Sequence, residues 1–318
     1  MDLLFEYSLF LLKLITYLIL IFIFIISVSY FFKKNIKKKY KLKIKSISNF
    51  YNHIIDISFK NKIQFNKKNF IKHTKWDYKK PILYVLSFYG DVHASEVSHL
   101  KKEISIIISI IQPNDEVLLK LESFGGTVHE YGLAASQLQR LRNHNIKLTV
   151  VIDKIAASGG YMMACVANYI YAAPFAIIGS IGVIGQIPNF HRLLKKNNID
   201  MEIHTAGHYK RNLTMFGENN DHHRLNFQKK LNITYKLFKD FIFKMRPNLN
   251  IEKVSNGDYW FGITALKKKL IDEINTSEDV ILKNMKKFNV ISIKYIKSRN
   301  IFNNFILNFL KKIFTILN

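Results

Sequence analysis

The run Ala156-Ala157-Ser158-Gly159-Gly160 places one hydroxyl group between small residues. It follows an expected strand and precedes an expected helix, so Ser158 lies at a strand-to-helix turn. At the start of a helix, free N–H groups and the helix dipole stabilise negative charge that develops on a nearby oxygen. Ser158 is therefore a candidate nucleophile. The alternative is an ordinary serine at a helix N-cap.

A serine nucleophile needs a base that takes its proton. The sequence offers three histidines, His191, His204 and His208, and one lysine, Lys210, in the run AGHYKR. A lysine can act as a base only where burial or its neighbours keep its amine neutral. The residue types and their spacing leave these alternatives open.

Metal and nucleotide chemistry find no support in the spacing of the residues. His129 has no second histidine four residues on, and His222 and His223 are adjacent, so their side chains diverge on a helix. The glycines of GSIGVIGQ (179–186) do not have the spacing of a dinucleotide-binding fingerprint. Cys165 is the single cysteine and is expected to be a buried thiol. We therefore expect no metal and no cofactor.

The segments around Ser158 are expected to alternate between strands and helices. Apolar runs with the length and composition of strands occur at Ile82–Phe88, Glu116–Glu122, Lys147–Ile152, Tyr169–Ala173 and Met201–Thr205. Helices are expected between the first three runs, which predicts a largely parallel sheet with helical crossovers. Reactive groups in such sheets lie on the turns at the carboxyl ends of strands. The turns SFGG, ASGG and GSIGVIGQ are expected at this edge.

An apolar segment near the N-terminus indicates a membrane anchor. Residues 14–32 carry no charge, and they are long enough to cross a bilayer core of about 30 Å. A cleaved signal peptide is the alternative, but the acidic start MDLLFE and the long apolar run favour a retained anchor. The lysine-rich residues 33–45 follow at once, and they favour contact with anionic lipid on the cytoplasmic side.

The high positive charge does not indicate a nucleic-acid partner. The formal net charge is +25, but the lysines are spread over the whole chain among many Ile, Asn and Phe residues. No nucleic-acid-binding motif and no platform of basic and aromatic residues occurs. We expect a solvated basic surface and no nucleic-acid binding.

Three long runs resemble the signal peptide peptidase A family of serine–lysine peptidases, in the family's order. They are LESFGGTVHEYGLAASQLQRLR (121–142), VIDKIAASGGYMMACVANYIYAAPFAIIGSIGVIGQIPNF (151–190) and HTAGHYKRNLTMFGENN (204–220). The resemblance covers about residues 80–285 and implies a crotonase-like α/β spiral, shared with the proteolytic subunit of Clp. The expected division of the chain is an anchor at 1–32, a basic connector at 33–80, a serine peptidase domain at 81–285 and a basic, apolar tail at 286–318.

The resemblance also implies roles for residues. Ser158 would be the nucleophile, and Lys210, 52 positions later, would be the general base. Gly125, Gly126 and Gly159 would line the oxyanion hole.

The chain departs from the family at one position of the first glycine turn. Relatives commonly have S-P-G-G where this chain has S-F-G-G, with Phe124 in place of proline. Without proline, φ at Phe124 is free and its N–H is restored. Both glycines remain, so we expect activity to survive.

The activity implied by the resemblance is that of a membrane-anchored serine endopeptidase. It would hydrolyse peptides or unfolded proteins through an acyl-enzyme, as a single-pass protein of the bacterial inner membrane in contact with lipid. Relatives with one catalytic unit form homo-oligomers in which the lysine reaches a neighbour's serine. They work from the periplasmic face, whereas the lysine cluster indicates the cytoplasm, so the side stays open. Two alternatives are an acyl-CoA hydratase or isomerase on the same fold, and a catalytically inactive membrane scaffold.

Overall fold

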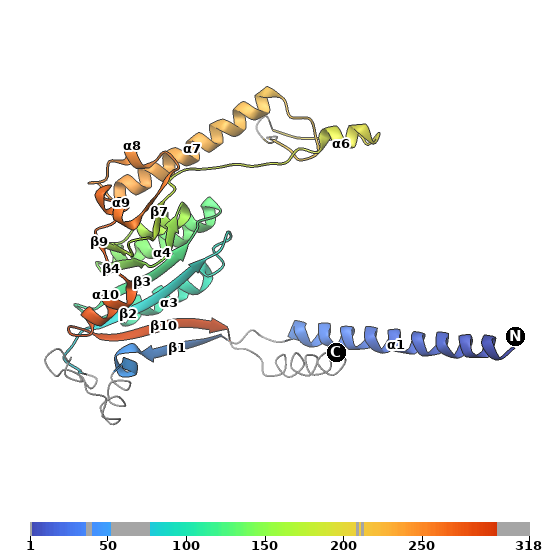
Figure 1. Cartoon of the computed structure of the whole chain (residues 1–318), viewed down its shortest axis with the longest axis horizontal. Helices are drawn as coiled ribbons and strands as arrows, with labels where there is room; N and C mark the ends of the chain where they lie inside the picture. The colour runs from blue at the N-terminus through green and yellow to red at the C-terminus, as the bar shows by residue number, and fades with distance from the viewer. Residues whose placement is uncertain (1, 36–39, 52–76, 208–209, 211–212, 298–318) are drawn as a thin grey trace. The chain divides into compact units, whose positions relative to one another are not determined.

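The computed structural model describes residues 2–35, 40–51, 77–207, 210 and 213–297 of the 318-residue chain. The chain divides into a large unit, Leu42–Tyr295, and a terminal unit formed by Met1–Lys41 and Ile296–Asn318. Each unit is described by itself (Figure 1).

A single sheet organises the large unit. Its order is β1-β10-β2-β3-β4-β6-β9, while β5 pairs with β3 and β7, and β7 pairs with β8. The pairs from β10 to β9 and those of β5 are parallel, whereas β7 and β8 are antiparallel. The strands are β1 (Tyr40–Ser46), β2 (Ile82–Gly90), β3 (Glu116–Ser123), β4 (Lys147–Ile152), β5 (Ile155–Ala157), β6 (Tyr169–Ala172), β7 (Ile177–Gly179), β8 (Tyr259–Phe261), β9 (Glu273–Ile274) and β10 (Asn289–Lys297).

Helices lie between most of the strands, as the alternation in the sequence predicted. They are α3 (Val97–Ile110), α4 (Val128–Asn143), α5 (Gly159–Ala164), α6 (His191–Lys196), α7 (Asp221–Met245), α8 (Ile251–Val254), α9 (Gly262–Lys267) and α10 (Ser277–Asn284). The start of α7 is fixed by Asn220, whose side chain accepts a hydrogen bond of 2.9 Å from the His223 N–H. The predicted α/β class with a largely parallel sheet is confirmed.

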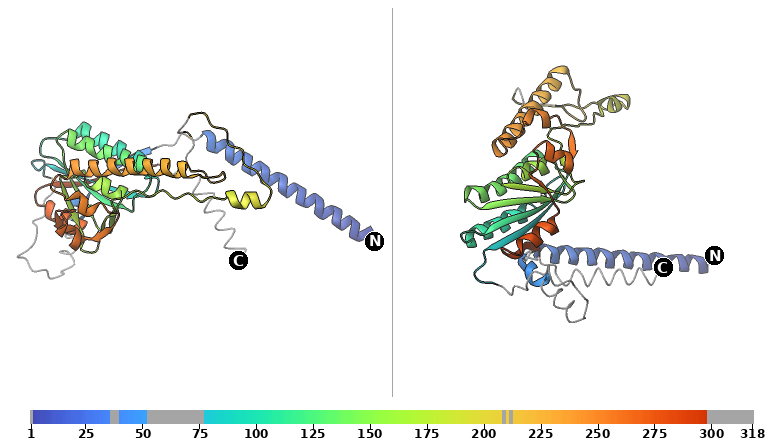
Figure 2. Two further views of the ribbon diagram at one scale, coloured as in Figure 1. Left: turned by 90° about the horizontal axis from the view of Figure 1, so that it is seen from above. Right: turned by 60° about the vertical axis from the view of Figure 1, so that its left-hand side comes forward.

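Both faces of the sheet are buried, because successive side chains of a strand point to opposite faces. Along β2, Leu86 and Phe88 pack with residues of α3 and α4, whereas Leu83 and Val85 pack with residues of α10. Figure 2 shows α3 and α4 on one side of the sheet and α10 on the other. This double cover explains why the strands read as continuous apolar runs in the sequence.

The structure corrects one expectation about the elements and adds two strands. The strand expected at Met201–Thr205 is wrong: residues 201–206 have no regular structure and are exposed, so no neighbouring strand satisfies their backbone. The segment expected as a basic connector contains β1, and the segment expected as a tail contains all of β10. These strands stand next to each other in the sheet, and their pairing joins parts of the chain that are far apart in sequence.

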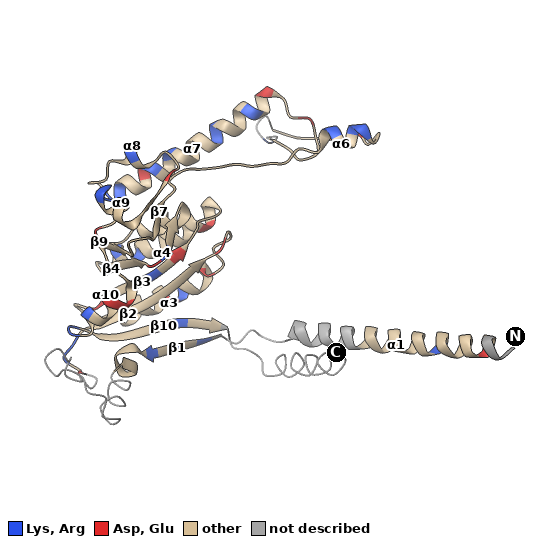
Figure 3. Ribbon diagram, in the orientation of Figure 1, with Lys and Arg blue, Asp and Glu red and all other residues tan. Residues whose placement is uncertain are grey.

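The terminal unit contains one long helix, α1 (Asp2–Asn35). Its segment Phe5–Phe24 has 20 residues, a mean hydropathy of 2.3 and no buried residue, so its length and composition suit a membrane span. Among the described side chains of α1, residues 5–24, Glu6 is the only acidic and Lys13 the only basic residue. Figure 3 shows the rest of this stretch without charge. This segment starts earlier than residues 14–32, the run that the sequence analysis singled out.

A buried carboxyl group holds the end of β10 against α3. Glu103 is 4% exposed, and its Oε1 accepts a hydrogen bond of 2.6 Å from the Tyr295 N–H. Burial raises the pKa of Glu103 to about 7; Glu96 raises it further, while the Tyr295 N–H and Lys294 oppose the shift.

The raised pKa of Glu103 predicts a pH-dependent free energy of unfolding. The carboxyl of the unfolded chain loses its proton near the ordinary pKa of 4.5, whereas the folded chain keeps this proton up to about pH 7. The contribution of Glu103 to the free energy of unfolding is therefore complete below pH 4.5 and is lost as the pH rises through 7. Between about pH 4 and pH 8, the free energy of unfolding of the wild type should fall by on the order of 3 kcal/mol, and this fall should be absent from Glu103→Gln. Urea unfolding of the full chain in detergent would show it, and an unchanged pH slope in the variant would contradict the assignment.

Candidate active site

Ser158 occupies a backbone conformation that non-glycine residues seldom adopt. It joins β5 to α5 with φ of 53° and ψ of −119°. Its N–H donates a hydrogen bond of 2.7 Å to the Gly179 carbonyl, and its own carbonyl accepts one of 3.0 Å from the Met162 N–H. The side chain makes no N-cap hydrogen bond, so the hydroxyl is not used to cap α5. Strain of this kind, typically ~1–3 kcal/mol, is concentrated at functional sites.

The glycine turn after β3 packs directly against Ser158. Gly125 has φ of 86°, and a Cβ built on it would lie 2.7 Å from the Gly159 nitrogen and 2.8 Å from the Ser158 Cβ. Gly126 lies against the Val92 backbone, and Gly159 lies against the Tyr131 ring, each too close for a side chain. The turn therefore brings the Gly125 backbone into direct contact with Ser158 and Gly159.

The N–H groups of these three glycines are not equivalent. The Gly125 N–H donates a hydrogen bond of 3.0 Å to the Ser123 Oγ. The Gly126 N–H has no acceptor among the described residues, and Gly159 is the first residue of α5, where the helix itself supplies no acceptor. Among the described residues, the N–H groups of Gly126 and Gly159 are thus not committed to an acceptor, whereas that of Gly125 is.

A buried chain of hydroxyl groups supports the turn. The Tyr131 hydroxyl donates to the Asp91 carbonyl at 2.8 Å, so it accepts from the Ser123 Oγ at 2.5 Å. Burial raises the pKa of Tyr131, which keeps its phenol protonated. Tyr131 was not among the candidate residues of the sequence analysis. A tyrosine at a core position carries a hydroxyl that needs a partner, and that was the available signal.

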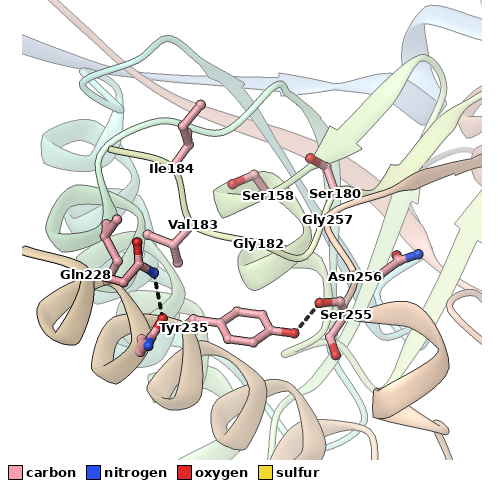
Figure 4. Close-up of a pocket in the computed structure, with 12 residues that line it drawn as sticks. Ser158, Ser180, Gly182, Val183, Ile184, Gln228, Tyr235, Ser255, Asn256 and Gly257 are labelled. Atoms are coloured by element: carbon pink, nitrogen blue, oxygen red, sulfur yellow. Dashed lines mark hydrogen bonds between the residues drawn. The ribbon is translucent and has the colours of Figure 1, made fainter. Parts of the chain in front are cut away.

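A cavity of about 500 Å³ opens beside Ser158 (Figure 4). It is lined by Ser158 and Ser180, by Gly182, Val183 and Ile184, by Gln228, Leu231, Asn232 and Tyr235 of α7, and by Ser255, Asn256 and Gly257. Ser180 also has a positive φ, 50°, and its N–H donates to the Asp258 carbonyl at 2.7 Å. Ser180 was not among the candidate residues, although it follows the first glycine of the GSIGVIGQ turn.

The structure of one chain does not bring the predicted base to Ser158. Lys210 is exposed, lies between α6 and α7, and is not part of the cavity wall. His191 is half-exposed, His204 is exposed and pairs with Glu202 at 3.5 Å, and neither lines the cavity. His208 lies outside the described residues.

The remaining expectations about chemistry concern metals and the thiol. Among the described residues, no group of three or more His, Cys, Asp or Glu side chains could hold a metal ion. Cys165 is buried, as predicted, and burial raises the pKa of its thiol, so it remains protonated and unreactive.

Comparison with known proteins identifies the family. The model of "Peptidase family S49" matches residues 140–291, and that of "Peptidase family S49 N-terminal" matches residues 2–138. The chain is 55% identical over 304 residues to "Probable protease SohB" of Buchnera aphidicola subsp. Schlechtendalia chinensis, covering 89% of this chain and 99% of the relative. The chain belongs to peptidase family S49.

A second curated relative agrees with this membership. The "Probable protease SohB" of Haemophilus influenzae is 45% identical over 315 residues, which cover 92% of this chain and 89% of the relative. Among solved structures, the 1510-N membrane-bound stomatin-specific protease matches with a TM-score of 0.42 and 17% identity over 64% of this chain and 84% of its own. ClpP1 from Listeria monocytogenes matches with a TM-score of 0.41 and 15% identity, covering 61% and 92%.

Membership of S49 identifies the chain as a peptidase, as the resemblance in the sequence implied. It disfavours the acyl-CoA hydratase or isomerase alternative, because the S49 models span both the glycine turns and the N-terminal part.

The contact between Gly125 and Ser158 predicts the effect of one methyl group. Gly125→Ala should reduce peptide hydrolysis by at least about 100-fold, because the added Cβ would displace Ser158 and the Gly159 N–H. The loss of one hydrogen-bond donor to an oxyanion typically costs about 10²–10³ in rate. Gly132→Ala on α4 is the matched control: its Cβ meets nothing within 4 Å. This control should keep activity and gain about 0.5–1 kcal/mol of stability. Equal activity of the two variants would contradict the role of Gly125.

Proposed function

We propose that the chain is a serine endopeptidase in which Ser158 is the nucleophile and Lys210 is the general base. The observation that carries the proposal is the Ser158 turn: a strained backbone, a hydroxyl that caps no helix, and the Gly159 N–H beside it. Nucleophiles on sharp strand-to-helix turns have these properties, because the turn exposes the hydroxyl next to free N–H groups.

The proposed reaction proceeds through an acyl-enzyme. The Ser158 Oγ attacks the carbonyl carbon of the scissile peptide bond, and the neutral Lys210 amine takes the hydroxyl proton. The N–H groups of Gly126 and Gly159 donate hydrogen bonds to the oxyanion. Lys210 returns the proton to the leaving amine, and water then hydrolyses the ester by the same relay. The substrates are peptides or unfolded proteins.

We further propose that the lysine comes from a neighbouring copy of the chain in a homo-oligomer. No Lys, His, Asp or Glu lines the cavity of one chain, so the described site lacks a base. Lys210 is exposed and available to a second copy. The segment that carries it also exposes apolar side chains, which suit an interface: Phe190, Leu193, Ile199, Met201, Met215 and Phe216.

The proposal includes anchoring in the bacterial inner membrane by α1 and contact with lipid. Its apolar segment Phe5–Phe24 supports a single span by length and composition. After washing of membranes with alkaline carbonate, the full-length chain should stay in the pellet. Release of a shortened chain that begins near Tyr30 would contradict anchoring and indicate a cleaved signal peptide.

The direct test of the peptidase proposal is Ser158→Ala. The change removes the attacking oxygen and little packing, so casein or peptide hydrolysis should fall to background while the fold is kept. Circular dichroism of the purified variant checks the fold. A residual rate close to that of the wild type would exclude Ser158 as the nucleophile, and an inactive wild type would favour the scaffold alternative.

Mixing two inactive variants tests the shared site. If Lys210 serves the Ser158 of a neighbour, oligomers of Ser158→Ala and Lys210→Ala chains contain some interfaces with both intact residues, and partial activity returns. If each site forms within one chain, every site keeps a defect. Pull-down with two tags verifies the mixed oligomers, and verified but inactive mixtures would refute sharing without refuting the peptidase assignment.

A further inference from the structure

The cavity beside Ser158 has walls from three segments of the chain. Residues 180–184 follow β7, residues 255–257 precede β8, and one face of α7 closes the remaining side (Figure 4). Its volume of about 500 Å³ lies within the usual range for ligand sites, roughly 300–1,000 Å³. This is enough space for a large side chain together with part of its backbone.

The chemistry of these walls is uncharged. Among the residues that line the cavity there is no Asp, Glu, Lys, Arg or His, and the polar groups are amides and hydroxyls. Several lining residues, including Gln228 and Asn232, are exposed, so water reaches the cavity, but a charged side chain that entered would meet no opposite charge in the walls. The walls therefore favour an uncharged side chain by composition and not by size.

The face of α7 supplies the hydrogen-bonding groups. Gln228 and Asn232 are one turn apart, and the Gln228 Nε2 donates to the Asn232 Oδ1 at 2.9 Å. This bond leaves the Asn232 amide N–H groups and the Gln228 Oε1 free to meet a ligand. Tyr235, in contrast, donates its hydroxyl proton to the Ser255 carbonyl and is held as part of the wall.

Other side chains in the walls are apolar. They are Val183 and Ile184 from the segment after β7, and Leu231 from α7. A side chain that runs from Ser158 into the cavity needs an apolar stem and, at its end, a group that both donates and accepts hydrogen bonds. Glutamine has this chemistry.

We infer that this cavity selects the substrate residue on the acyl side of the scissile bond, and that it takes a long, uncharged side chain ending in an amide. The inference rests on the proposed function, with Ser158 as the nucleophile. In the acyl-enzyme, the carbonyl carbon of that residue is bonded to the Ser158 Oγ, so its side chain starts at the border of this cavity. Asn232 and Gln228 are the specificity-determining residues.

Peptides that differ only at this residue test the selection. The full chain in detergent should cleave a glutamine peptide with the highest kcat/KM, a methionine peptide less well, and glutamate and lysine peptides at least about tenfold less well than glutamine. Glutamate is the sharpest comparison, because it matches glutamine in shape and differs in charge. Equal cleavage of the glutamine and glutamate peptides would overturn the inference.

A substitution in the wall gives a second, independent readout. Asn232→Asp places a carboxylate in the cavity and should raise kcat/KM for the lysine peptide, relative to the glutamine peptide, by about tenfold. Ile233→Asp is the matched control: it adds the same charge one position along α7, about 100° around the helix, on an exposed residue outside the cavity wall. It should leave the preference unchanged.

The outcomes separate the inference from the proposed function. Ser158-dependent cleavage with no change of preference in Asn232→Asp, or with the same change in Ile233→Asp, overturns the assignment of the cavity alone. A preference that follows the residue on the leaving-group side also overturns it. The absence of any Ser158-dependent cleavage overturns the proposed function, and the assignment of the cavity with it.

Discussion

The register of three parallel strands around Ser158 is the constraint on which the site depends. Ser123 of β3 pairs with Ala156 of β5, and Ala157 of β5 pairs with Gly179 of β7. All three strands therefore end at one edge of the sheet, and the turns that follow them meet there. The turn after β3 packs against Ser158, the turn after β5 carries the Ser158 hydroxyl, and the turn after β7 forms part of the cavity wall.

Close packing keeps Ser158 in its unfavourable conformation. The helix that follows it, α5, is fully buried, and the Gly179 carbonyl fixes the Ser158 N–H from the other side. Gly125 fills the remaining space without a side chain. Strain of ~1–3 kcal/mol persists only where such surroundings determine the conformation. The site therefore uses burial in the core to hold a reactive group at the surface of the sheet edge.

The sequence predicted the sheet, its crossovers and the Ser158 turn, because apolar runs and small residues are local signals. It failed at Met201–Thr205, where a strand-like run has no neighbouring strand. It missed β1 and β10 because their pairing is not local. The base was named only through the resemblance to a family, since 52 residues of separation define no distance in space. The apolar pattern of α4 gave no sign of the hydroxyl contacts of Tyr131.

The central claim is that a hydroxyl activated by a lysine reacts as a nucleophile. Labelling of the full chain with a peptidyl phosphonate, followed by mass spectrometry of the adduct, tests it most directly. The account predicts one adduct, on the Ser158 Oγ, that forms in the wild type and is lost in Lys210→Arg, because an arginine keeps the charge but cannot accept the proton. An adduct on another residue, or undiminished labelling of Ser158 in Lys210→Arg, would contradict the account.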